Sequence, residues 1–130
     1  MAIDVIVPDK DKGLYDNWHF ASAVRSTDLV FCSGQIGSKE DGSVPESAED
    51  EFRNAWNNVG RVLKAAGLSF DNIIEYTSFH VNLNDHVQTF MKVRDEFLSE
   101  PWPAWTAIGI TELALQGARV EIRVTASKTE

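Results

Sequence analysis

The sequence predicts one α+β domain in which two helices cover one face of a mixed β-sheet. Its 130 residues have the usual size of a single domain, and a second domain would be too small to hold a core. Strand-like segments occur before, between and after two stretches with helical periodicity. Residues 1–130 are therefore expected to form a single domain with the element order β-β-β-α-β-α-β-β.

Three short strands are expected before the first helix. Residues 3–7 alternate between apolar and polar side chains, and Pro8 ends this strand. Residues 18–24 and 29–32 are rich in aromatic and β-branched side chains, with Ser, Thr and Asp between them, which predicts a hairpin.

The first helix gives the clearest pattern in the chain. Ser47 is its expected N-cap and Gly67 its expected C-terminal stop, about 20 residues apart. Its apolar residues recur at steps of three and four, as on one face of a helix: Ala48, Phe52, Ala55, Trp56, Val59, Leu63 and Ala66.

The second half of the chain adds a helix and three strands. Residues 73–81 have strand composition, and Asn84 or Asp85 is expected to cap a helix that extends to Leu98. After an extended connection that contains two prolines, strands are expected at residues 105–110 and 119–126. Large side chains occur on both faces of the predicted sheet, and two helices cover one. A second copy of the chain is therefore expected to cover the other.

Composition excludes several classes of partner. The net charge is -8 and the twelve basic residues are scattered, so neither nucleic acid nor an anionic membrane surface is an expected partner. Cys32 is the only cysteine, so no intramolecular disulfide is possible. The sequence has no apolar run of 18 residues, and residues 1–10 do not resemble a signal peptide, so we expect a cytoplasmic protein.

Motifs for metals, cofactors and nucleophiles are absent from the sequence. His19, His80 and His86 lack the spacing of metal ligands, so no metal is expected. The glycines match no phosphate-binding loop, and no cofactor is expected. Cys32 lies within a predicted strand, where a buried, unreactive thiol is expected.

Two features remain as a candidate small-molecule site. The strand that ends at Ser33-Gly34 exposes backbone N–H groups that suit a carboxylate or carbonyl oxygen, although the glycine is equally explained by the turn alone. We expect the aliphatic residues of 105–110 to pack under the helices, leaving Trp105 and Arg123 on the opposite face. Arg123 there would bind an anion or form a salt bridge between subunits.

Five segments, which run in the order of a known family, carry a resemblance to it: residues 28–37, 63–67, 82–85, 103–104 and 117–122. In them the sequence resembles the RidA family, also called YjgF or, historically, L-PSP endoribonuclease. The resemblance implies a chorismate-mutase-like fold and a homotrimer with three clefts between subunits. It also implies hydrolysis of 2-enamines and 2-imines to 2-keto acids and ammonia, without a cofactor.

The match to the family's site residues is partial. Gly34 occupies the position whose backbone N–H helps to bind the substrate carboxylate. Trp105 stands where the family has its clamping arginine, and Ala107 where a cysteine often lies. The water-positioning glutamate would come two residues after Glu121, where Arg123 stands, and a guanidinium cannot act as a base.

The tyrosine that often caps the family's cleft aligns with Phe20, whereas Tyr15 could replace it only with an insertion. The sequence thus predicts a subgroup without the clamping arginine. Such a protein would hydrolyse an imine or related small organic acid by a variant mechanism, or act as a non-catalytic ligand-binding or chaperone-like trimer. A ribonuclease rests on the family's older name, and the charge of -8 speaks against it. The predicted substrate-binding residues are Phe20, Ser33, Gly34, Trp105, Ala107 and Arg123.

Overall fold

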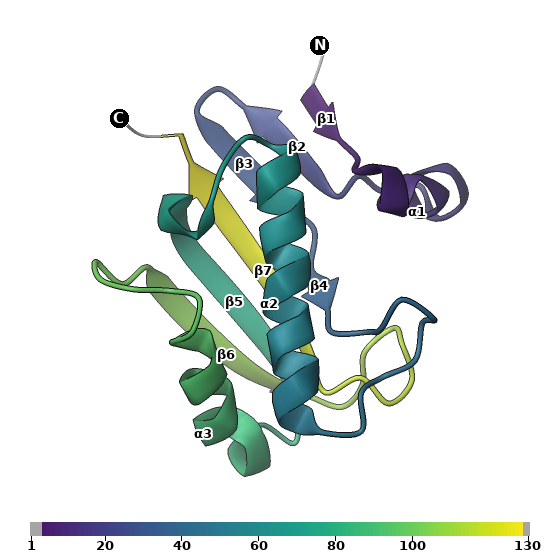
Figure 1. Ribbon diagram of the computed structural model, residues 1–130, viewed down its shortest axis with the longest axis vertical. Coiled ribbons are helices and arrows are strands. Elements are labelled where there is room, and N and C mark those ends of the chain that lie inside the picture. The colour runs from purple at the N-terminus through teal and green to yellow at the C-terminus, as the bar shows by residue number, and fades with distance from the viewer. Residues whose placement is uncertain (1–3, 129–130) are drawn as a thin grey trace.

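The computed structural model describes residues 4–128 and shows one seven-stranded mixed sheet (Figure 1). The strand order is β1-β2-β3-β7-β5-β6, and β4 pairs with β7 beyond the end of β3. Every pairing is antiparallel except that of β5 with β6. The strands are β1 Asp4–Ile6, β2 Ala23–Ser26, β3 Leu29–Cys32, β4 Gln35–Ile36, β5 Ile73–Val81, β6 Ala104–Ile110 and β7 Val120–Ser127.

Two long helices, α2 (Ala48–Ala65) and α3 (Leu83–Arg94), lie on the same face of the sheet (Figure 1). This confirms the expected α+β architecture with two helices on one face. The core between the layers is aromatic at its centre, where Trp56 contacts Tyr76 and Phe90 with ring centroids 5.3 and 6.0 Å apart. Both pairs bury apolar area, and the Trp56–Tyr76 pair also has the favourable edge-to-face geometry, with planes 73° apart.

The ends of α2 agree with the sequence. The Ser47 hydroxyl accepts a hydrogen bond from the Asp50 N–H (3.1 Å), as an N-cap does, and α2 is 18 residues long. Gly67 has a φ of +78°, the left-handed conformation that favours glycine just after a helix.

Two elements that the sequence did not predict, α1 (Lys12–Trp18) and β4, are present, and several boundaries differ from the expectation. Residues Lys12–Trp18 form a short helix, α1, beside β1 and β2 (Figure 1), and the strand expected over 18–24 begins only at Ala23. α3 is capped at Asn82 rather than Asn84 or Asp85 and ends at Arg94 rather than Leu98. Two 3₁₀ turns, Asp9–Asp11 and Phe70–Asn72, are the remaining elements. Ile3, the first residue of the predicted first strand, lies outside the residues that the structure describes.

An ion pair between Glu51 and Arg119 connects α2 to the start of β7. Glu51 is fully buried, and its carboxylate accepts hydrogen bonds from the Arg119 backbone N–H (2.6 Å) and from Arg119 Nη1 (2.7 Å). Arg119 also donates to the carbonyls of Pro45 and Glu46. The pair therefore ties the loop before α2 to the strand that carries the candidate site.

The face of the sheet opposite α2 and α3 is called the open face below. Alternation along β7 buries Val120, Ile122 and Val124 under the helices, so Glu121 and Arg123 project from the open face. Large apolar side chains also lie there, with Phe31 41% and Ile108 40% exposed. Within residues 4–128, no helix is long and apolar enough to cross a membrane.

Candidate functional site

The Ser33-Gly34 turn is held by its serine and leaves its glycine N–H available. The Ser33 N–H donates to the Ser22 carbonyl (2.8 Å), and the Ser33 hydroxyl donates to the Ala21 carbonyl (2.7 Å). Among residues 4–128, the Gly34 N–H has no hydrogen-bond acceptor outside regular secondary structure. The turn therefore offers a fixed backbone donor, which is one of the two roles that the sequence left open for it.

A β-bulge brings this turn against Arg123. Phe31 pairs with Thr125 and Gln35 with Ile122, so three residues on one strand lie opposite two on β7. Ser33 and Gly34 are thus together opposite Arg123. Bulges of this kind occur frequently beside active sites, because they turn the backbone and side chains locally.

Glu121 lies directly against Gly34. A Cβ atom placed on Gly34 would overlap the Glu121 carboxylate, so only glycine lets the two approach. Burial raises the pKa of this half-buried carboxyl above its ordinary value. Neither a hydrogen bond nor an ion pair engages the Glu121 carboxylate from any residue between 4 and 128. Glu121 was not among the predicted site residues, although alternation along residues 119–126 places it on the same face as Arg123.

The neighbouring strand β5 contributes the residues that lie beside Glu121 and Arg123 on the open face. Thr77 pairs with Arg123, and Phe79 pairs with Glu121. The arrangement places a backbone donor, a carboxyl with a raised pKa and an exposed guanidinium next to one another. Together these three groups can bind an anionic small molecule and exchange a proton with it.

The expectation that Trp105 shares a face with Arg123 is wrong. The Trp105 ring lies on the helix face, stacked on Tyr76 with centroids 5.9 Å apart and planes 13° apart. Its Nε1–H donates to the Ser78 hydroxyl (2.8 Å). Ala107, which pairs with Ser78, also lies on the helix face, whereas Ile108 is left on the open face. The large indole ring gains more from burial against other aromatic rings than an isoleucine would.

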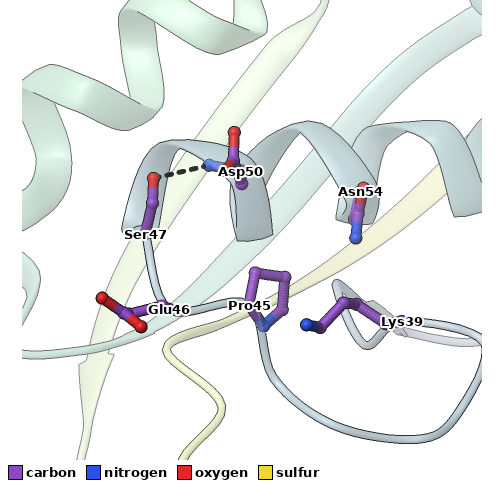
Figure 2. A pocket seen from close by; sticks show the side chains of 6 residues that line it. All are labelled: Lys39, Pro45, Glu46, Ser47, Asp50 and Asn54. Atoms are coloured by element: carbon purple, nitrogen blue, oxygen red, sulfur yellow. Dashed lines mark hydrogen bonds between the residues drawn. The ribbon is translucent and has the colours of Figure 1, made fainter.

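A surface pocket of about 630 Å³ lies elsewhere, at the N-terminal end of α2 (Figure 2). It contains none of the predicted site residues, and its charged groups are of both signs. Figure 2 shows the Ser47 hydroxyl already engaged by the Asp50 N–H. The pocket is lined by Lys39, Pro45, Glu46, Ser47, Asp50 and Asn54.

Comparison with known proteins decides the family. The sequence model of the RidA/YjgF family, described as "Endoribonuclease L-PSP", matches residues 14–128. The chain belongs to the RidA family. It is 41% identical over 122 residues to the RutC family protein YjgH of Escherichia coli (strain K12), covering 93% of this chain and 92% of that protein.

Two solved structures and one further relative extend this result. A solved structure of a protein YjgH matches with a TM-score of 0.88 and 39% identity, covering 100% of this chain and 99% of that one, which confirms the RidA-type fold. A 2-iminobutanoate/2-iminopropanoate deaminase of Dermatophagoides farinae is 32% identical, over 79% of this chain and 80% of that protein. The E. coli protein TdcF, solved with bound serine, has a TM-score of 0.78 and 29% identity, covering 85% of this chain and 88% of that one.

Phe20 and Tyr15, the two candidates for the residue that caps the family's cleft, both lie in the segment before the Ser33-Gly34 turn. Phe20 is 39% exposed and directly precedes Ala21, whose carbonyl accepts the Ser33 hydroxyl. Tyr15 lies on α1 and is 42% exposed. Both are thus within the N-terminal segment that leads to the Ser33-Gly34 turn, and the choice between them stays a prediction.

His80 and Cys32 are buried in the core of the protein. Within residues 4–128, no group of three His, Cys, Asp or Glu side chains is arranged to hold a metal ion. His80 is fully buried, shares a hydrogen bond with the Ser78 hydroxyl (2.8 Å), and has a pKa lowered by burial to about 4. Cys32 is buried in β3, as expected.

We expect Cys32 to resist alkylation in the folded protein. Burial raises the pKa of its thiol to about 11, so roughly one thiol in a thousand is ionised at pH 8. Iodoacetamide labelling followed by mass spectrometry should proceed at least tenfold more slowly in buffer than in denaturant. Equal rates in both conditions would show that the thiol is accessible.

Proposed function

We propose that this protein is a homotrimer that hydrolyses imines or enamines derived from small amino acids, in clefts between its subunits. Family membership and the deaminase relatives support the reaction class. Serine bound to TdcF supports a ligand of amino-acid size. The observation that carries the proposal is the half-buried carboxyl of Glu121, which has a raised pKa and lies against the free donor of Gly34.

The site is divided between the two faces of the sheet. Gly34, Glu121 and Arg123 lie on the open face, whereas Trp105 and Ala107 lie on the helix face of the edge strand β6. One chain cannot bring these groups into one pocket. In a ring of copies, however, the open face of one subunit can meet the β6 edge of the next.

Exposed apolar residues on the open face support the trimer. Phe31 is 41% exposed there, so Phe31→Glu should place a charge in the interface and convert the trimer into monomers. Multi-angle light scattering would measure the mass. The control is Asn57→Glu on the exposed side of α2, which should leave the trimer intact. A wild-type monomer, or a trimeric Phe31→Glu variant, would contradict the arrangement.

The proposed reaction adds water to the C=N carbon of a 2-imino acid whose nitrogen has first taken a proton from solvent to give the iminium form. The Glu121 carboxylate accepts a proton as the water oxygen forms its bond to carbon, which gives a carbinolamine. The resulting carboxylic acid then donates a proton to nitrogen, the C–N bond breaks, and ammonia leaves as the C=O bond forms. The hydroxyl proton returns to Glu121 or solvent, so the net change is imine plus water to 2-keto acid plus ammonia.

The other groups on the open face bind rather than transfer protons. Gly34 N–H is a donor for a substrate oxygen, and its backbone position is fixed by the Ser33 hydrogen bonds. Arg123 stays protonated and attracts anionic substrates to the cleft. Because imines react with water unaided, positioning and one proton-transfer group suffice for a modest acceleration.

The direct test is ammonia release from a panel of 2-imino acids generated in situ, including 2-iminopropanoate and 2-iminobutanoate. We expect the purified protein to accelerate hydrolysis of at least one member above the uncatalysed rate. An absence of acceleration across the panel would contradict the enzymatic function.

A non-catalytic, ligand-binding trimer is the second candidate function. It is favoured by Arg123, which stands where the family's water-positioning glutamate is expected and cannot act as a base. In that case metabolites would raise the melting temperature without turnover, and Arg123→Ala would weaken their binding.

A further inference from the structure

Arg94, the last residue of α3, forms a cluster with the aromatic residues at the β6 edge. Its guanidinium carbon lies over the indole rings of Trp102 and Trp105, 5.7 and 5.2 Å from their centroids. Both distances are within the range of favourable cation–π contacts, about 6 Å. The aromatic faces therefore hold the guanidinium in place at the end of the helix.

The guanidinium keeps donors that the protein does not use. Its Nε donates to the Asp95 carboxylate (3.0 Å), and the Tyr76 hydroxyl lies beside it. Of the five N–H donors of an arginine, at least three are thus left over. The Arg94 side chain is only 14% exposed and its Nε side is paired with the Asp95 carboxylate, so a ligand would reach the guanidinium through its unused Nη donors.

The Trp105 ring beneath Arg94 is held in a fixed position. Trp105 is fixed by stacking on Tyr76 and by its hydrogen bond to Ser78, and its ring also stacks on Phe90 with centroids 6.0 Å apart. Trp102 is 54% exposed and forms the rim of the cluster towards solvent. A planar ligand can therefore contact aromatic surface while its charged end meets the guanidinium.

We propose that the edge of the Arg94 guanidinium, flanked by Trp102 and Trp105, binds the carboxylate of a planar organic acid. A guanidinium presents paired N–H donors that match the two oxygens of a carboxylate. The assignment of that acid as the substrate of imine hydrolysis rests on the proposed function; the binding itself does not. Arg123 is a weaker candidate for this contact, because its side chain is exposed to water, whereas that of Arg94 is largely buried.

The test compares a small planar acid with its neutral amide. Binding of 2-oxobutanoate and of 2-oxobutanamide would be measured by calorimetry and by the fluorescence of the indoles. We expect the wild-type protein to prefer the acid, and Arg94→Gln to weaken acid binding about tenfold or more and to remove the preference. Arg94→Lys keeps the charge but not the paired donors, and should bind the acid with intermediate affinity.

Lys92→Gln is the matched control, since it removes one positive charge from the same helix at an exposed position. It should change acid binding less than twofold, and the melting temperature of each variant shows whether it is folded. Acid binding that is unchanged in both Arg94 variants, or a wild-type protein that binds neither probe, would overturn the inference.

The imine panel separates this inference from the proposed function. If the wild-type protein hydrolyses an imine while acid binding is independent of Arg94, the carboxylate site is wrong and the function stands. If the acid binds through Arg94 but no imine is hydrolysed faster than in buffer, the carboxylate site stands and the enzymatic function is wrong.

Discussion

Replacing Glu121 with Gln is expected to lower the rate of imine hydrolysis at least about a hundredfold, the usual contribution of a positioned acid–base group. The amide keeps the shape of the side chain against Gly34 but cannot accept a proton from water. The measurement is kcat/KM for ammonia release from the best substrate of the 2-imino acid panel, with trimer mass and melting temperature recorded for the same preparation.

The pH dependence gives this prediction a second readout. Burial raises the pKa of Glu121 above its ordinary value, so its carboxylate form is lost at a higher pH than that of an exposed glutamate. Activity should therefore fall as the pH decreases through the raised pKa, and this acid limb should be absent from the residual activity of Glu121→Gln. Glu112→Gln, at an exposed position before β7, is the control. Equal activity of Glu121→Gln and wild type would remove Glu121 from the mechanism.

Replacing Glu51 with Ala is expected to destabilise the protein by about 3–5 kcal/mol, because it leaves the Arg119 guanidinium and the backbone N–H of Arg119 without their buried acceptor. The Glu51 carboxylate is fully buried and joins α2 to the start of β7. We expect the melting temperature to fall by roughly 10 °C or more, as measured by calorimetry or circular dichroism.

Glu49→Ala is the matched control for Glu51. Glu49 lies in the same first turn of α2, but its ion pair with Arg53 is exposed to solvent and should contribute little to stability. Similar melting temperatures of the two variants would show that the buried pair is not a main tie between α2 and β7. Loss of Glu51 should also lower activity, since β7 carries Glu121 and Arg123.

The sequence predicted the strands and long helices because each has a strong local signal. α2 has a complete apolar face, a serine cap and a glycine stop, and β5 was predicted with the same limits that the structure shows. α1 was missed because it buries no residue, so its seven residues carry no apolar periodicity to detect. Asn82 was missed as a cap because it has a left-handed φ of 58° and no capping hydrogen bond from its side chain.

The site was predicted only in part, for a reason that lies in the geometry of strands. Alternation shows which residues of a strand share a face, but it does not show which face is buried. On β6 both faces carry apolar residues, and only the partners Tyr76 and Ser78, distant in sequence, place Trp105 under the helices. For β7 the aliphatic residues decide the buried face clearly, so Arg123 was correctly predicted on the face opposite the helices.

In the proposed trimer, each active cleft combines the open face of one copy with the β6 edge of the next. Mixed trimers test this most directly: Glu121→Gln and Arg94→Gln chains, each of low activity at subsaturating substrate, are unfolded together and refolded in equal amounts. Random mixing leaves about a quarter of the clefts with both halves intact, so we predict recovery of about a quarter of wild-type activity. Activity that stays at the level of the separate variants, with mixed trimers confirmed by mass, would contradict a cleft shared between subunits.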